Sequence, residues 1–175
     1  MDFALPVHPP STLVAHPGCA GCLDARVWAL AVDRADPTPA LDGDLGLGRL
    51  FRHFRWGPSA WPVAWCDLPR AGVVDCGVFA DVSAVVLAAR GVECTRLQLV
   101  EAAEPAQTAL WRARWARAAC PDAWILSDRA VYHEALVVRT DAGELLFDPT
   151  ELRPVGANGR APLWSRRWPG EWTEG

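Results

Sequence analysis

Cys76 opens a stretch, "CGVFADVSAVVLAARG", whose residue types suit nucleophilic chemistry. Valines recur at helical spacing from Val78 to Val86, and Gly91 is a natural terminator, so a helix should begin at or beside Cys76. A cysteine attacks as its thiolate, and a helix N-terminus lowers a thiol pKa through unpaired amides and the helix dipole. We therefore predict a nucleophile there, with the same amides available to stabilise an oxyanion.

A thiol nucleophile also needs a base, and histidine is the side chain best suited to that role near neutral pH. The chain has four histidines. Two lie in the N-terminal arm and His53 lies among Arg and Phe, whereas His133 lies within "RAVYHEALVVRT", an apolar run typical of a strand. Its placement makes His133 the candidate base.

Asp148 is the candidate third member, an acceptor that fixes the imidazole tautomer and orientation. Residues 129–140 and 143–150 should form two strands that flank "DAG", a hairpin signal. With an even loop, such as Arg139 to Ala142, His133 lies opposite Asp148, and a shift of register by two makes them diagonal neighbours. An odd loop would put the two side chains on opposite faces.

These stretches together resemble the transglutaminase-like superfamily of papain-type Cys-His-Asp enzymes. The resemblance rests on "DCGVFADVSAVVLAARGV", on "YHEALVVRTDAGELLFDPT" and on the strand between them, or roughly residues 72–151. It implies an α+β fold with a papain-like core, in which the cysteine helix packs on an antiparallel sheet. It also implies that Cys76 is the nucleophile, His133 the base and Asp148 the orienting residue.

The sequence departs from the family at positions that line its acyl-binding groove. Family members often have an aromatic residue after the cysteine, where Gly77 stands here, and Ala-Trp after the histidine, where Glu134-Ala135 stand. The family's upstream oxyanion donor has no assured counterpart, although Trp61, Trp65 or a Gln could serve. We therefore take Trp61, Trp65 and Gly77 as candidate substrate-binding residues, and Glu134, on the strand face opposite His133, as structural.

The resemblance implies attack on an amide, ester or thioester carbonyl through an acyl-enzyme, without a cofactor and with a peptide or small acyl substrate. Hydrolysis and acyl transfer both remain open. A small single-domain member resembles peptide-processing enzymes, such as the leader peptidases of lasso-peptide pathways, or biosynthetic enzymes more than secreted crosslinkers. Two alternatives stay open: a cell-wall-type Cys-His endopeptidase or amidase, and a non-catalytic peptide-binding module with a Trp-rich groove.

Composition excludes several other classes of protein. The formal net charge is −4, all seventeen basic side chains are Arg, and no Arg-rich block indicates a nucleic-acid partner. The lack of Lys excludes a lysine Schiff base. No apolar run predicts a membrane span and no signal-peptide pattern opens the chain, so we expect a cytoplasmic protein whose oligomeric state is open.

"HPGCAGC" places His16, Cys19 and Cys22 at ligand-like spacing, with His8 available as a fourth ligand. A structural zinc site needs four ligands, commonly from two such segments, and only one is visible. We therefore expect a plain loop and helix start with no metal, and keep metal binding and a redox pair as alternatives. Cys66, Cys94 and Cys120 should be core residues.

The remaining pattern predicts one domain over residues 1–175, with an extended arm at 1–20, a catalytic core at 72–151 and a mostly irregular tail at 152–175. Leu23, Val27 and Leu30 should share one face of the first helix. The expected helices are 22–32, 47–54, 76–90 and 105–119, and the expected strands are 92–102, 129–140 and 143–150.

Overall fold

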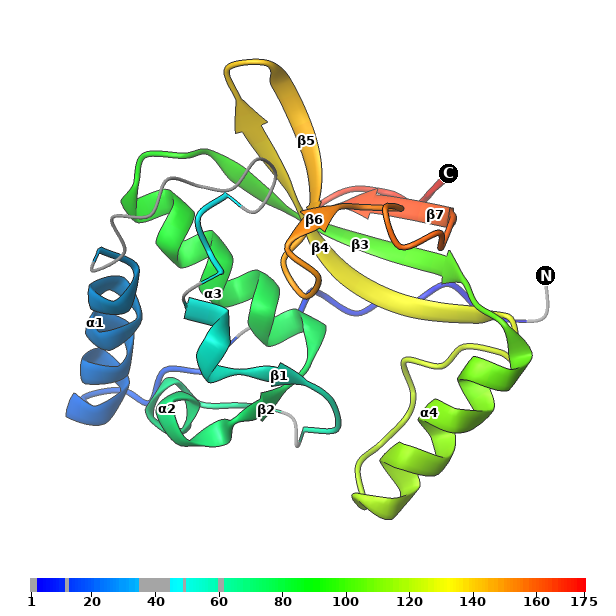
Figure 1. Cartoon of the computed structure of the whole chain (residues 1–175), viewed down its shortest axis with the longest axis horizontal. Coiled ribbons are helices and arrows are strands. Elements are labelled where there is room, and N and C mark those ends of the chain that lie inside the picture. Colours follow the sequence, from blue (N-terminus) through cyan, green and yellow to red (C-terminus); the bar gives the residue numbers. More distant parts are fainter. Residues whose placement is uncertain (1–2, 12, 35–44, 49, 60–61) are drawn as a thin grey trace.

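The computed structural model describes residues 3–11, 13–34, 45–48, 50–59 and 62–175. As expected, its architecture is mixed α+β, with helices beside an antiparallel six-stranded sheet (Figure 1). The strands, in sheet order, are β6 (Arg153–Pro154), β5 (Gly143–Asp148), β4 (Ala130–Thr140), β3 (Cys94–Ala102), β7 (Pro162–Arg167) and β8 (Thr173–Glu174).

Helices and two very short strands complete the described chain. The elements are α1 (Ala20–Arg34), α2 (Leu68–Ala71), α3 (Cys76–Ala89), α4 (Pro105–Arg117), the 3-10 turns η1 (Leu50–His53) and η2 (Trp65–Asp67), and the parallel pair β1 (Arg55–Trp56) and β2 (Val73–Val74). In Figure 1, α1, α2 and α3 lie together on one side, whereas α4 extends from the far end of β3. Among the described helices, none is both long and apolar enough to cross a bilayer.

Helix α3 begins at Cys76, as the sequence predicts. Its N-cap is Asp75, which accepts a hydrogen bond from the Val78 amide at 2.9 Å. Gly91, just after the helix, has φ +80, a conformation that glycine adopts without strain. Phe79 packs edge-on against Phe51, with ring centroids 4.7 Å apart, and this contact anchors the helix in the core.

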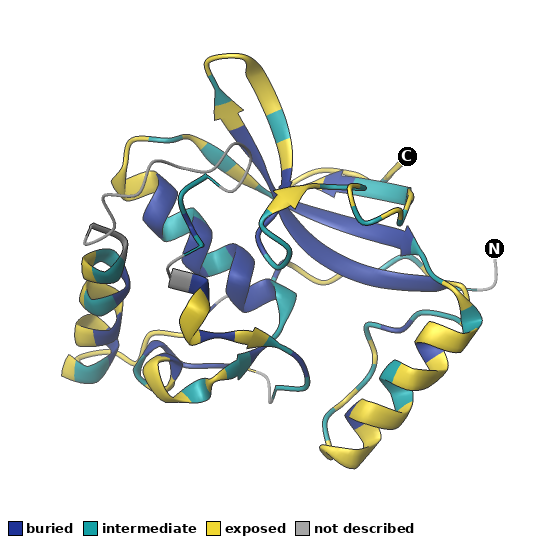
Figure 2. Cartoon of the chain, in the orientation of Figure 1, coloured by how far each residue is buried: buried dark blue, intermediate teal, exposed yellow. Residues whose placement is uncertain are grey.

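The centre of the sheet is covered on both faces. Buried residues concentrate in α3, β3 and β4, whereas α4 and the turn between β4 and β5 are largely exposed (Figure 2). In β3 the side chains from Leu97 to Glu101 are all buried, so the strand does not show the one-sided burial that its alternation suggested. The reason is that the N-terminal arm at His8 and the side chain of Arg166 in β7 cover the second face, where both contact Gln98.

The buried face of α1 differs from the prediction. Leu23 and Val27 are 64% and 55% exposed, whereas Cys22, Ala25 and Ala29 are buried. Small side chains on this face allow α1 to approach η2 and α3 closely, and Cys22 faces Cys66 of η2. The contacts of the helix N-terminus, and not its longest apolar residues, therefore set its rotation.

The tail was expected to be mostly irregular, but it also contains a regular strand, β7, that the sequence analysis did not predict. The strand pairs with β3 in antiparallel register, Leu99 facing Ser165. A charged residue such as Arg166 is not expected in a buried strand, so the sequence pattern did not indicate one. In the structure Arg166 is buried: its guanidinium donates a hydrogen bond to Gln98 at 2.7 Å and stacks between Trp168 and Trp172, with each ring centroid 4.9 Å from the guanidinium carbon. The expected helix at 47–54 is also wrong, because only the short turn η1 forms there in the described residues.

Candidate active site

Cys76 occupies the first position of α3, at the point where the β2 strand turns into the helix. His133 lies in β4, which packs directly beside α3. The Cys76 thiol and the His133 ring lie close enough that each shifts the pKa of the other; His133 is buried and Cys76 is half-buried. The structure therefore brings the predicted nucleophile and base into contact.

The register of the β4–β5 hairpin decides where Asp148 lies. The hairpin pairs Thr140 with Gly143, which leaves a two-residue loop and confirms the even parity. Because the pairing continues to Leu136 and Phe147, His133 and Asp148 are diagonal neighbours and not directly opposite. The first of the two predicted registers, with His133 directly opposite Asp148, is therefore wrong. It required a four-residue loop, whereas Arg139 and Thr140 belong to the paired strand.

His133 and Asp148 form a close charge pair. Nε2 of His133 lies 3.0 Å from Oδ2 of Asp148, and the two side chains are 8% and 3% exposed. The oxygen lies off the axis of the ring N–H, since Nε2 makes no straight hydrogen bond in the described structure. The other carboxylate oxygen, Oδ1, accepts a hydrogen bond from the Thr150 amide at 2.8 Å, which fixes the carboxylate.

The pair shifts both titrations in the direction expected for opposite charges. Burial alone lowers the pKa of His133, but the negative charge of Asp148 and the polar contacts with Asp148 and Cys76 outweigh it and hold that pKa well above 6.5. Burial raises the pKa of Asp148, but the imidazolium of His133 outweighs it, so that pKa lies below 3.8. The imidazolium–carboxylate pair is thus the stable form near neutral pH.

The pKa of Cys76 moves in the opposite direction from the one predicted. Burial raises it above the ordinary thiol value, and the lowering by His133 does not fully offset this rise. The negative charges of Asp75 and Glu134 raise it further. A helix N-terminus therefore does not suffice to hold this thiol as a thiolate, because the site is too dry and has two carboxylates nearby.

The first-turn amides of α3 are also less available than expected. Asp75 accepts a hydrogen bond from the Val78 amide at 2.9 Å, and the Gly77 amide lies near the same carboxylate. Cys76 borders a cavity, and two buried polar atoms of residues that line it have no hydrogen-bond partner among the described residues: Nε1 of Trp124 and Oγ1 of Thr150. The indole N–H of Trp124 is a donor that sequence reasoning missed, because nothing in its surroundings marks it.

Cys76 and His133 open into a cavity of about 320 Å³. One wall is made of tryptophans whose rings contact one another at centroid distances of 5.0 to 6.0 Å: Trp56, Trp111, Trp115 and Trp124. Trp56 comes from β1 and the others from α4 and the loop after it, so these rings join α4 to the body of the protein. Trp111 and Trp115 could be found in the sequence by their helical spacing.

A charged cluster lies at another wall of this cavity. Glu101 of β3 is 1% exposed and pairs with Nε of Arg160 at 2.9 Å. Arg160 also contacts Glu151 at 3.1 Å and lies over the Trp111 ring, 6.0 Å from its centroid. The cavity therefore combines an aromatic surface with a single described Arg that is already paired to carboxylates.

The three predicted substrate-binding residues have different positions. Gly77 lines the cavity, and its Cα approaches the arm so closely that an added Cβ would lie 2.3 Å from Cβ of Ser11. Trp65 is buried in the core and lines a separate hollow beside His16, so the prediction that it contacts substrate is wrong. Trp61 lies outside the described residues.

The N-terminal arm forms part of the cavity wall through Ser11. The Ser11 amide donates to Oε1 of Glu134 at 2.8 Å, and Glu134 accepts from the Tyr132 hydroxyl at 2.7 Å. Glu134 also pairs with Arg96, whose guanidinium donates to the Ser11 carbonyl at 2.8 Å. Glu134 has the structural contacts expected of it, although it also borders the cavity.

A second group of chemistry-bearing side chains lies away from the cavity. One ligand atom each of His16, Cys19, Cys22 and Cys66 lie within 4.8 Å of one another. His8, the predicted fourth member, is elsewhere, with its ring 5.1 Å from that of Tyr132. Cys66 takes that place. It is half-buried and packs against the core, as predicted, but its sulfur belongs to this cluster.

The chain matches no protein-family model, no curated protein and no solved structure. The residues of the cavity and their contacts are therefore what carries the proposal of function.

Proposed function

We propose that the protein is a cysteine-nucleophile enzyme that acts on an amide, ester or thioester carbonyl through an acyl-enzyme. The observation that carries this proposal is the placement of Cys76 beside His133, with Asp148 at 3.0 Å from the imidazole, at the wall of a cavity. A core cysteine needs neither a histidine partner nor an open space in front of it. Papain-like topology belongs to the same proposal.

In this mechanism, Nε2 of His133 faces Asp148, which leaves Nδ1 for the Cys76 thiol. The site first loses one proton to water, which leaves the Cys76 thiolate beside the His133 imidazolium. The sulfur then attacks and bonds to the carbonyl carbon, and the imidazolium gives its Nδ1 proton to the leaving group as that bond breaks. Water or an amine then cleaves the thioester. Asp148 acts as the orienting residue because it holds the ring and its charge.

The raised pKa of Cys76 shapes how this chemistry would start. With His133 already charged and the thiol neutral at neutral pH, the reactive thiolate–imidazolium pair is a minor form that grows with pH. The Trp124 N–H is the cavity donor best suited to the developing oxyanion, since it has no partner among the described residues.

The cavity indicates the class of acyl group. Its volume of about 320 Å³ is at the small end of ligand sites, and a tryptophan wall favours an apolar or aromatic acyl chain, or one such side chain of a peptide. Arg160 is engaged by two carboxylates, so the cavity offers little to an anionic substrate.

Acylation by an activated ester tests the proposal. The full chain is mixed with p-nitrophenyl acetate, and intact-mass and peptide analysis follow the acetyl group on Cys76. The wild type and Cys120→Ser should acylate at the same rate, and Cys76→Ala should not acylate at that peptide. Acylation of Cys76 no faster than of Cys120 would sink the proposal.

A non-catalytic peptide-binding module is the second candidate, and the four-tryptophan wall favours it. In that case an aromatic peptide should quench tryptophan fluorescence equally in the wild type and in Cys76→Ala, with no acyl-enzyme formed in either. Binding together with acylation would instead assign the tryptophans to substrate recognition by the enzyme.

A further inference from the structure

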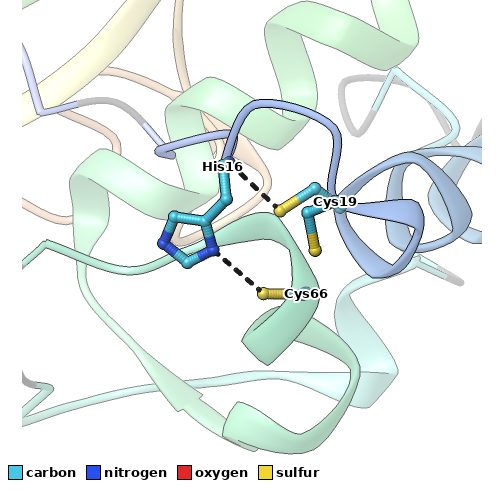
Figure 3. A group of neighbouring side chains, drawn as sticks. His16, Cys19 and Cys66 are labelled. Carbon is cyan, nitrogen blue, oxygen red and sulfur yellow. Dashed lines mark hydrogen bonds between the residues drawn. The ribbon is translucent and has the colours of Figure 1, made fainter.

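The cluster formed by His16, Cys19, Cys22 and Cys66 lies outside the Cys76 cavity, where it borders a separate hollow, and so stands independently of the proposed function. From its geometry we infer that these four side chains bind one zinc ion. The ligands come from two segments, the turn that enters α1 and the 3-10 turn η2 (Figure 3).

The distances fit a tetrahedral ion. With Zn–S of about 2.3 Å and Zn–N of about 2.1 Å, neighbouring sulfur and nitrogen ligands lie roughly 3.6 Å apart and two sulfurs roughly 3.8 Å apart. Sγ of Cys66 lies 3.7 Å from Nδ1 of His16, and all four atoms lie within 4.8 Å of one another. Only small side-chain movements separate the cluster from a coordination sphere.

The backbone around the ligands is already built for this arrangement. In "HPGC" the Cys19 amide donates to the His16 carbonyl at 3.1 Å, and Gly18 has φ +69, so the proline and glycine close a tight turn between two ligands. The His16 amide donates to Sγ of Cys22 at 3.4 Å. Such N–H donors to sulfur are typical outer contacts of thiolate ligands, because they stabilise the negative charge.

Gly21 allows the second segment to approach. An added Cβ at Gly21 would lie 3.2 Å from Cβ of Cys66 and 3.7 Å from Sγ of Cys19. The arm also pairs with the chain before η2, since the Val14 amide donates to the Val63 carbonyl at 2.9 Å and the Trp65 amide donates to the Val14 carbonyl at 3.0 Å. Backbone contacts thus hold Cys66 against the turn of residues 16–22 that begins α1.

The donor set selects the metal. Three thiolates and an imidazole are soft and borderline ligands that suit zinc, and calcium and magnesium are excluded because they require oxygen ligands. On binding, the three thiol protons pass to water and Nε2 of His16 keeps the ring proton. The resulting site carries one negative charge, and Arg26 borders the same hollow with a positive one. The ion would lock the arm and α1 to η2.

Metal content and cobalt spectroscopy on the full chain test the inference. Protein refolded with zinc and dialysed should hold about one ion per chain, and cobalt in its place should show the intense visible bands of tetrahedral thiolate coordination. Cys66→Ser should lose most of the bound metal, and Cys120→Ser should keep it. Cys66→His should restore binding because histidine also ligates zinc, which separates lost ligation from lost folding.

Thiol protection in the wild-type chain gives a second measurement that needs no variant. Zinc should slow alkylation of Cys19, Cys22 and Cys66 at least about tenfold while leaving Cys120 unchanged. No retained metal, octahedral cobalt, equal zinc in wild type and Cys66→Ser, or a disulfide within the cluster in place of metal would each overturn the inference.

Discussion

The protein holds two cysteine–histidine sites that differ in what surrounds the sulfur. In the cavity a single half-buried thiol meets one histidine, which pairs with a carboxylate at 3.0 Å. In the cluster three thiols meet one histidine, and its four ligand atoms include no carboxylate oxygen. A lone thiol beside a charged imidazole suits transient bond formation, whereas several thiols around one point suit a resident cation. The side chains around each cysteine, and not the exposure of the cysteine, therefore distinguish the two proposed chemistries.

The largest effect should come from His133→Ala. Because it removes the imidazolium that pairs with the Cys76 thiolate, acylation of Cys76 by p-nitrophenyl acetate should fall about a thousandfold. Zinc content should stay at the wild-type level, since His133 is not a member of the cluster and lines a different cavity. Stopped-flow release of nitrophenol and metal analysis on one preparation measure both. Equal loss of zinc and acylation would show that the two sites are not separate.

Asp148→Asn should cost about 3 kcal/mol of unfolding free energy, with a characteristic pH dependence, because it breaks a buried charge pair. The pKa of His133 is raised above 6.5, so its contribution is complete below pH 6.5 and is lost as pH rises through the folded value. The pKa of Asp148 is lowered below 3.8, so its contribution is present above that pH and is lost in stronger acid.

Thermal unfolding of wild type and Asp148→Asn should therefore differ most between about pH 4 and 6.5, and less at alkaline pH. Stabilisation by zinc has the opposite slope, since acid protonates the ligand thiols and releases the metal. Chelator-treated and zinc-loaded wild type should thus converge as the pH falls. Parallel curves for the two sites would contradict the comparison.

Two glycine substitutions compare how tightly each site is packed. Gly77→Ala should destabilise the protein by about 2 kcal/mol, because the new Cβ would lie 2.3 Å from Ser11 and push the arm off the cavity. Gly21→Ala meets Cys66 at 3.2 Å, and its helix propensity gain offsets a mild clash, so stability should change by less than about 1 kcal/mol. Urea unfolding measures both, and a larger cost at Gly21 would reverse the expected order.

The smallest effect should come from Asp75→Asn. Asparagine keeps the N-cap hydrogen bond, so stability should change by only a few tenths of a kcal/mol. The negative charge of Asp75 raises the pKa of Cys76, so the pH midpoint of Cys76 alkylation by iodoacetamide should move down in the variant. Asn at position 75 should leave the alkylation midpoint of Cys120 unchanged. An upward shift at Cys76 would mean that the cap, and not the charge, controls the thiol.

Local signals predicted the elements that carry the candidate site. Helix α3 follows from its Val and Ala spacing with Asp75 before it, and the hairpin follows from the turn residues between two apolar runs. The exact register did not follow from these signals. Whether Arg139 and Thr140 belong to the loop or to the strand depends on cross-strand pairing, and this choice moves Asp148 by two positions.

Features fixed by distant contacts could not be predicted from the local pattern. Cys66 meets the turn of residues 16–22 only after the chain has folded back. With this contact on one side of α1, Leu23 and Val27 face outward. Likewise, the direction of the Cys76 pKa depends on burial and on Glu134, which comes from another element. The hidden strand β7 needs the two rings and the Gln98 amide that neutralise the cost of burying Arg166.

The hydrogen bond between Ser11 and Glu134 has a consequence for the order of assembly. It joins residues 123 positions apart in the chain, and it completes the wall next to Cys76. Contacts of such long range form late, since the intervening chain must first be synthesised and closed into a loop. A nascent chain that has already made Cys76 and α3 would thus carry an unfinished cavity, and the nucleophile would meet its surroundings only after β4 has left the ribosome.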